Sequence, residues 1–497
     1  MHVAKCARIN VGIMLLPAMI VGATTVSMPA ACEENISETW DLSVQLLQRS
    51  LDFPHSIMPN SIPGEAIPVA DTLNGFGNEI VDKTVGPFTD LVHKSVAEVM
   101  SLSLGFMAVG MLGTFLGIFM VSQRPVEHAH VCTWAMLSFT ITVFCSSLVA
   151  HAMFGFGDSF DLPETTAVSI GVGWTCAFFA AAQFLPHLLA TSNIKAACAT
   201  LGANLAGLIA VHTVGDVLQL FVGDRATTVS ASTVVAVVLL LWFALAGFCT
   251  VARVVYVYLL QRGNDDDEES EEDFWRPTRD FFGLTAGFLI SVISRFCITG
   301  VLPPSALLQR APRNITVKQV AQLYVASLSF LSVAVAIRIW QKKPAQEGGA
   351  ESQTFLMMQH VLVKSKAWCL LFAADWLFTI GTKNVLSEED MMLHQVLVAI
   401  VDTVIVLACV YIMSSLTSRY GLLGSTIRPF FVSYGLVMGL SWAPVFWLSS
   451  DCVGKYLDMA GQRLLPKQIS GTILADMSMT AVLCVSLLPA WILYVFP

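Results

Sequence analysis

Long apolar runs recur along the chain at a spacing typical of membrane-spanning helices. A helix needs about 20 apolar residues to cross the hydrocarbon core of a bilayer. The runs are uniformly apolar and do not alternate with polar residues, which excludes a closed β-barrel. We therefore expect an all-α polytopic membrane protein with about 11 transmembrane helices. The predicted spans are residues 102–121, 131–150, 165–189, 196–214, 229–260, 281–301, 318–340, 366–382, 393–416, 429–448 and 469–495.

A further apolar run, residues 11–26, lies near the N-terminus and has two interpretations. Lys5 and Arg8 precede it and small residues follow it, which is typical of a secretory signal peptide within residues 1–31. Alternatively, the run is kept as a first transmembrane helix, which raises the count to about 12. Under either hypothesis, the segment 32–101 is extracytoplasmic.

Charged residues are scarce in this chain. They make up 13% of the 497 residues, whereas 55% are hydrophobic. Soluble domains carry roughly a quarter charged residues, so the deficit places the chain in the membrane class. The net charge of −9 reflects mainly one acidic tract and an acidic N-terminal segment, and it gives no indication of nucleic-acid binding. The expected partners are the lipid bilayer and a small solute or ion.

The charges between the spans predict an orientation. Bases flank alternate gaps on one side, whereas the opposite gaps are richer in acids, so the basic side is predicted to be cytoplasmic. This puts the N-terminal segment outside and the C-terminus in the cytoplasm, in a secretory-pathway or plasma membrane. The bases are Arg124, Lys195, Arg262, Arg276, Arg279, Arg338, Lys342, Lys343, Lys364, Lys366, Arg419 and Arg428.

A weak internal repeat relates the two parts of the chain. A shift of roughly 230 residues superposes the second to fifth spans on the eighth to eleventh. Because the shift is an even number of spans, the halves 102–260 and 281–497 would share one orientation. The alternative is that any two sets of apolar helices align to some degree. The equivalences are Trp134 with Trp368, Ala203 with Gly435 and Gly207 with Gly439.

The predicted linker between the halves, residues 261–280, is strongly acidic. A run of this kind is most often a solvated tether. Ser270 is followed by acids, which makes it a candidate for an acid-directed kinase.

Several residues predicted to lie on the outer side are candidates for secretory-pathway modification. Asn35 and Asn314 begin sequons for N-glycosylation. Cys32 and Cys452 are the cysteines expected outside the spans on that side, so they form the one candidate disulfide. Most of the other cysteines fall in apolar runs, where a thiol behaves as a small hydrophobe.

Four ionisable residues fall inside predicted spans at about the same depth. Arg295, Asp375, Asp402 and Asp476 each cost on the order of 3 kcal/mol in hydrocarbon, so such groups usually face a protein interior or a water-filled path. Three acids and one base neutralise one another only in part. A spare carboxylate could be protonated or bind a cation, as ion-coupled transport requires. The alternative is a buried ion pair of Arg295 with one acid that only fixes helix contacts.

A histidine and a carboxylate lie near this layer. His212 and Asp216 are one turn apart at the end of the fourth span, where an imidazole could relay protons or sense pH. A capping or interfacial role is the alternative. We therefore regard Asp476, His212 and Asp216 as peripheral to a central site of Arg295, Asp375 and Asp402.

These features predict a multi-pass transporter or channel for a small solute or ion, with protons or cations as coupling partners. The alternative is a non-transporting membrane scaffold or complex subunit. No phosphate-binding loop, zinc-type histidine pair, serine elbow or kinase motif occurs, so we expect no enzyme activity, cofactor or metal. The count of about twelve spans resembles major facilitator transporters and otopetrin-type proton channels. However, Ser122-Gln123-Arg124-Pro125 stands where the former carry a basic Gly-Asp-Arg-type loop, so neither family is assigned.

Overall fold

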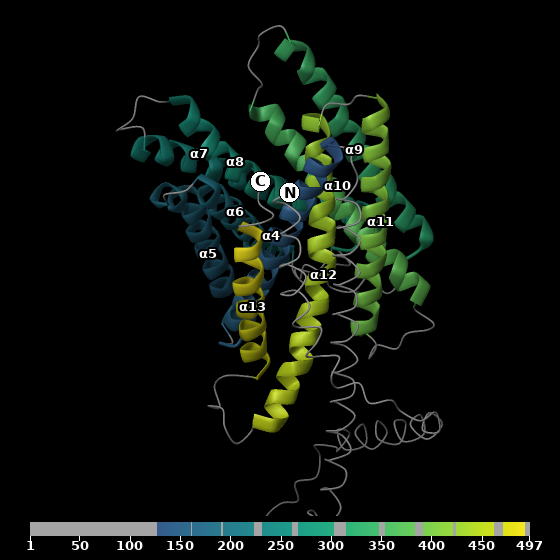
Figure 1. Ribbon diagram of the computed structural model, residues 1–497. Helices are drawn as coiled ribbons and strands as arrows, with labels where there is room; N and C mark the ends of the chain where they lie inside the picture. Colours follow the sequence, from purple (N-terminus) through teal and green to yellow (C-terminus); the bar gives the residue numbers. More distant parts are fainter. Residues whose placement is uncertain are drawn as a thin grey trace, which may run out of the picture. The chain divides into compact units, whose positions relative to one another are not determined.

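The computed structural model describes the chain from Glu127 onward, apart from several connections (Figure 1). The segments 1–31 and 32–101 and the predicted first span, 102–121, lie outside the described residues. The described residues are 127–160, 162–189, 192–222, 231–260, 267–302, 315–346, 353–382, 391–420, 424–461 and 471–492.

Regular structure in the described residues is entirely helical. Nine of the helices are long and apolar enough to cross a membrane, which confirms the prediction of an all-α polytopic membrane protein. A short 3₁₀ turn, Leu185–Leu188, follows α5, where Pro186 cannot continue the α-helical hydrogen bonds. The α-helices are α4 (Glu127–Asp158), α5 (Glu164–Phe184), α6 (Ser192–Val222), α7 (Ala231–Leu260), α8 (Asp267–Thr299), α9 (Val317–Gln346), α10 (Gln353–Thr382), α11 (Met391–Tyr420), α12 (Gly424–Gly461) and α13 (Gly471–Ala490).

The helices follow the predicted second to eleventh spans one by one, but several are longer. α8 begins at Asp267 rather than near residue 281, and α10 begins at Gln353 rather than near residue 366. Hydropathy locates only the apolar part of a helix, and the polar first turns of α8 and α10 fall outside it. α10 is not one of the nine most apolar helices, because its interior carries Lys364, Lys366 and Asp375.

The acidic segment after α7 is not a tether along its whole length. From Asp267 onward it forms the start of α8, and the helix continues through Pro277. Phe274 and Thr278 are buried, and the Thr278 hydroxyl oxygen accepts a hydrogen bond of 3.0 Å from Gln183 Nε2 on α5. This packing against α5 explains why residues 274–280 are ordered despite the acidic run before them.

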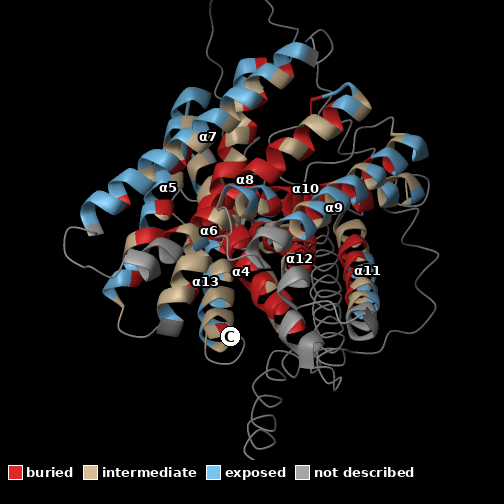
Figure 2. Ribbon diagram, turned by 90° about the horizontal axis from the view of Figure 1, so that it is seen from above, coloured by how far each residue is buried: buried red, intermediate tan, exposed pale blue. Residues whose placement is uncertain are grey.

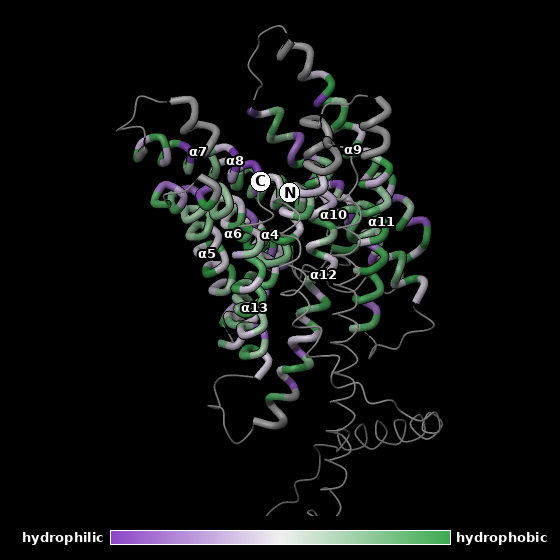
Figure 3. Tube along the Cα trace, in the orientation of Figure 1, coloured by the Kyte–Doolittle hydropathy of each residue, from purple (hydrophilic) through white to green (hydrophobic). Residues whose placement is uncertain are grey.

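Buried and exposed helices are clearly distinguished (Figure 2). The most apolar stretch of α12 is 83% buried, and α4, α6 and α8 are also mostly buried. In α13 the corresponding share is 11%, and α5, α7 and α9 are similarly exposed. Many exposed side chains are nevertheless apolar, among them Leu240, Phe243 and Val485. The helices are mostly hydrophobic along their length (Figure 3). So many exposed apolar side chains on long apolar helices fit contact with lipid.

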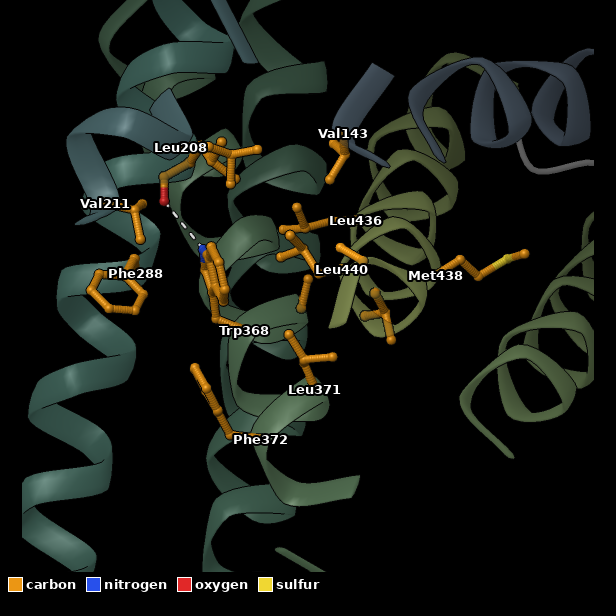
Figure 4. Close-up of a cluster of buried hydrophobic side chains, with 14 of the residues drawn as sticks. Val143, Leu208, Val211, Phe288, Trp368, Leu371, Phe372, Leu436, Met438 and Leu440 are labelled. Atoms are coloured by element: carbon orange, nitrogen blue, oxygen red, sulfur yellow. Dashed lines mark hydrogen bonds between the residues drawn. The ribbon is translucent and has the colours of Figure 1, made fainter. Parts of the chain in front are cut away.

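α10 lies among the buried helices and packs against α8, α9, α11 and α12. Trp368 is fully buried and edge-to-face with Phe288 of α8 (Figure 4). Its indole Nε1 donates a hydrogen bond of 3.2 Å to the carbonyl oxygen of Leu284, also on α8. α8 ends at Thr299, and Gly300 follows at φ 71°, the left-handed conformation common after a helix C-terminus.

Glycines allow the closest helix contacts. A methyl group at Gly435 of α12 would lie 2.7 Å from the carbonyl oxygen of Met136 on α4, and one at Gly439 would lie 2.9 Å from that of Thr140. Gly207 lies against the side chain of Leu284 on α8, whose Cδ2 would be 2.9 Å from a methyl group there. The small residues therefore mediate packing within the chain, which is what their spacing predicts.

Candidate functional site

Arg295 lies in the C-terminal half of α8 and is buried. Its guanidinium carbon is 3.6 Å from the centre of the Phe372 ring of α10 and 5.7 Å from that of Phe288. Its Nε has no hydrogen-bond partner, and Arg295 forms no ion pair with any carboxylate of the described residues. Asp375 interacts with Arg295 electrostatically, but from beyond ion-pair distance.

Two lysines of α10 are buried inside the bundle, about three turns after the helix begins. Lys364 Nζ lies 3.4 Å from the centre of the Phe139 ring of α4 and has no hydrogen-bond partner among the described residues. Lys366 Nζ donates a hydrogen bond of 3.1 Å to Ser433 Oγ and lies 3.5 Å from the centre of the Tyr434 ring.

The burial of these lysines corrects the sequence interpretation. Lys364 and Lys366 were expected at the cytoplasmic end of the span 366–382, because charge usually marks the end of a span. The apolar run Val361 to Val363 directly before Lys364 is the signal that placed them inside a helix, and all three of its residues are buried.

Asp402 of α11 is held by α12. Its Oδ2 accepts a hydrogen bond of 2.5 Å from Ser441 Oγ. The next residue on each helix forms a second hydrogen bond between α12 and α11, in which Trp442 Nε1 donates to Thr403 Oγ1 at 3.0 Å. Asp402 is 2% exposed, so this acid lies in the protein interior as its sequence context predicts.

Asp375 of α10 is paired with a histidine that sequence analysis did not identify. His394 Nε2 of α11 lies 3.7 Å from Asp375 Oδ1. The other ring nitrogen, Nδ1, is 3.2 Å from Thr382 Oγ1. His394 stands alone in its stretch of sequence, and nothing there indicates its partner.

The structure brings the three central residues into one region. Asp375 is close enough to interact electrostatically with both Arg295 and Asp402. No two of the three form a direct ion pair. Each acid has its own polar partner at close range, whereas the close contacts of the arginine that we find among the described residues are with the Phe372 and Phe288 rings.

The peripheral residues form a second cluster around α4, α6, α12 and α13. Asp476 Oδ2 lies 3.9 Å from His151 Nε2, and the His151 ring is stacked on Trp447 at 4.3 Å. His212 packs against Phe154 at 4.6 Å and interacts electrostatically with His151. Asp216 lies one turn further along α6 and is partly buried.

A third polar group lies near the N-terminal part of α10. His360 Nδ1 is 4.0 Å from Asp280 Oδ1 of α8, and Arg279 Nη1 donates a hydrogen bond of 3.1 Å to Gln353 Oε1. These contacts join the middle of α8 to the N-terminal part of α10.

The predicted modification sites are not tested. Asn35, Asn314 and Cys32 lie outside the described residues, as does the side chain of Ser270, although its backbone is part of α8. Cys452 is a free thiol in α12. The glycosylation, the disulfide and the phosphorylation stay predictions.

No group of three or more His, Cys, Asp or Glu side chains suited to a metal ion occurs within the helices that the structure describes. Comparison of the chain with family models, with curated proteins and with solved structures finds no match. The functional argument therefore depends on the geometry alone.

Proposed function

We propose that this protein is a membrane transporter for a small solute or ion, with its site between α8, α10 and α11. The observation that carries the proposal is a buried Lys364 ammonium and a buried Arg295 guanidinium, neither of which forms an ion pair with a carboxylate of the described residues. Asp280 and Asp375 interact with them electrostatically, but from beyond ion-pair distance. Burying an unpaired charge costs several kcal/mol. Such groups in membrane proteins mark substrate and ion paths.

Asp402 supports a proton as coupling ion. Ser441 Oγ lies within hydrogen-bonding distance of two oxygens, Asp402 Oδ2 at 2.5 Å and Val437 O at 2.8 Å. A hydroxyl has one proton and can donate to only one of them at a time. Both contacts are satisfied together when the Asp402 carboxyl carries a proton. A carboxyl that gains and loses a proton during the cycle would couple solute movement to a proton gradient.

Helix packing supports two related halves. The predicted equivalences pair α4 with α10, α5 with α11, α6 with α12 and α7 with α13. The contacts α4–α6, α5–α6 and α6–α7 then correspond to α10–α12, α11–α12 and α12–α13, and all six occur. The extensive α4–α12 contact departs from this pattern. Its equivalent would be a contact between α10 and α6, but α8 packs against both of these helices instead.

A membrane scaffold is the second candidate. The observation that favours it is the burial of Asp402, which together with Thr403 fastens α11 to α12 through two hydrogen bonds. Under this hypothesis the polar groups only fix helix contacts, and the protein moves nothing.

A flux assay decides between the two. The full chain is reconstituted into liposomes containing a pH-sensitive dye, and the parent is compared with Asp402→Asn. We expect the parent to acidify or alkalinise the lumen under a solute gradient, and the variant to lose this response. Glu164→Gln is the matched control, because it also replaces a carboxylate with an amide but at an exposed position on α5. A parent that moves neither protons nor solute under any gradient supports the scaffold instead.

A further inference from the structure

The contact between α8 and α10 carries charges and aromatic rings in a regular order. The helices run in the same direction, so pairs along α8 and α10 follow one another. Gly287 meets Lys364, Phe288 meets Trp368, and Arg295 meets Phe372. We call these six residues the α8–α10 seam.

We propose that the solute is a small anion, and that Lys364 and Arg295 bind it at two successive positions along the α8–α10 seam, with Trp368 as the barrier between them. This inference rests on the proposed transport function and names the substrate class. Chloride, phosphate and short carboxylates are all candidates, because each is a small anion that accepts hydrogen bonds from a cationic donor.

Lys364 provides the first position. An ammonium group has three donors, and none of them has an acceptor among the described residues. The Phe139 ring face, 3.4 Å from Nζ, attracts the charge but replaces only part of the hydration that burial removes. Gly287 allows α8 to approach α10 closely at the lysine backbone, since a methyl group there would lie 2.9 Å from Lys364 Cβ. Asp280 interacts with the ammonium electrostatically but does not bond to it, so the ammonium is a charged donor whose hydrogen bonds have no acceptor among the described residues.

Arg295 provides the second position. Phe372 covers one face of the guanidinium and leaves its edge, where the N–H donors point, uncovered by that ring. Nε is without an acceptor among the described residues. The edge of a guanidinium binds carboxylate and phosphate through two parallel hydrogen bonds.

The barrier lies between these positions. The eight residues from Lys364 to Phe372 rise about 12 Å along α10, and Trp368 stands halfway. Its ring is stacked on Phe372 at 5.9 Å and edge-to-face with Phe288 at 5.2 Å (Figure 4). The hydrogen bond to Leu284 O fixes the indole in this orientation. An anion at Lys364 reaches Arg295 only when this ring moves.

The acids of the region do not take the place of the anion. Asp402 accepts a hydrogen bond from Ser441, and Asp375 lies against His394. Asp280 interacts electrostatically with Lys364, but its ion-pair partner is His360. Lys366 of the same helix differs from Lys364, because its ammonium has a hydrogen-bond acceptor, the Ser433 hydroxyl, in addition to an aromatic ring, that of Tyr434. An unneutralised cation repels a cationic solute and attracts an anionic one.

Uptake of radiolabelled chloride, phosphate and acetate into proteoliposomes tests the proposal. We expect uptake of at least one of these anions well above protein-free liposomes, and a loss of about tenfold or more in Lys364→Met and in Arg295→Met. Lys318→Met, at an exposed position on α9, should leave uptake unchanged. Circular dichroism and size-exclusion profiles confirm that each variant is folded.

Each other outcome has a definite meaning. Proton or potassium flux by the parent without uptake of any of the three anions overturns the anion inference and leaves the transport proposal standing. Equal anion uptake by the parent and both folded variants also overturns it. If either variant fails to fold, the anion inference is tested by the melting temperature of the parent protein. It should rise in the salt of the transported anion relative to sodium gluconate at equal ionic strength, and no rise overturns the inference.

Discussion

Ser441 Oγ of α12 lies 2.5 Å from Asp402 Oδ2 of α11, and the adjacent Trp442 and Thr403 are bonded across the same pair of helices. Two consecutive residues on each helix therefore fix the register of α11 against α12. α11 is otherwise the more exposed of the two helices. The polar pairs thus attach a largely lipid-facing helix to the buried core.

Ser441→Ala should destabilise the protein. The substitution leaves a buried Asp402 carboxyl without its hydroxyl partner, and an unsatisfied buried polar group costs about 1–3 kcal/mol. Thermal unfolding in detergent, followed by circular dichroism, measures the effect. Ser486→Ala is the matched control, because Ser486 is exposed on α13 and bonds only backbone carbonyls of its own helix. Equal melting temperatures for Ser441→Ala and the parent would show that the contact contributes little.

Gly435→Ala should also destabilise the protein, by about 1–3 kcal/mol, through overpacking. The new methyl group would lie 2.7 Å from the carbonyl oxygen of Met136, which is helix backbone and cannot move aside alone. Gly247→Ala is the control, since a methyl group there meets nothing within 4 Å. Thermal unfolding of the two variants side by side is the measurement. A parent-like Gly435→Ala would mean that α4 and α12 separate easily.

These glycines illustrate what the sequence predicts well. Helical class, helix order and the contact role of Gly435 and Gly439 follow from apolar periodicity and residue size, which are local properties. Helix ends are predicted poorly, because hydropathy ignores polar turns that tertiary contacts hold in a helix. Thr278 is such a residue, bonded to Gln183 of α5.

For a similar reason, the sequence indicates which buried residues are charged but not which residues they contact. A charge within an apolar run identified Arg295, Asp375 and Asp402, but their partners are aromatic or neutral and come from other helices. The ring that covers Arg295 is Phe372, and one phenylalanine among the 30 of the chain carries no sign of this role. Lys364 was misplaced because a rule about span ends was applied to a residue in a helix interior.

Lys366→Met should stabilise the protein or leave its stability unchanged. Methionine resembles the lysine side chain in length, and replacing buried charge with apolar groups of similar volume is often neutral or stabilising by about 1–4 kcal/mol. Ser433 keeps a partner, because its hydroxyl also donates to Phe430 O. Thermal unfolding of Lys366→Met is compared with Lys318→Met, whose exposed position predicts a change within about 0.5 kcal/mol. A clear fall in melting temperature for Lys366→Met alone would instead show that its bond to Ser433 stabilises α10 against α12.

Trp368→Ala should both destabilise the protein and increase anion leak. Truncating a fully buried tryptophan costs about 3–5 kcal/mol, and it removes the ring between Lys364 and Arg295. Trp368→Phe retains a ring and loses only the hydrogen bond to Leu284 O, so its cost should be closer to 1 kcal/mol. Thermal unfolding gives the first quantity, and passive chloride efflux from proteoliposomes gives the second.

Trp340→Ala is the control for the leak experiment, because Trp340 is exposed on α9 and packs edge-to-face on Phe355. We expect parent-like efflux from this variant, faster efflux from Trp368→Ala, and an intermediate or parent-like rate from Trp368→Phe. Lower stability with unchanged efflux in Trp368→Ala would keep the tryptophan in the core and remove it as the barrier. Trp340 is exposed and is not part of the α8–α10 seam. Faster efflux in all three variants would therefore indicate a general loosening of the helix bundle.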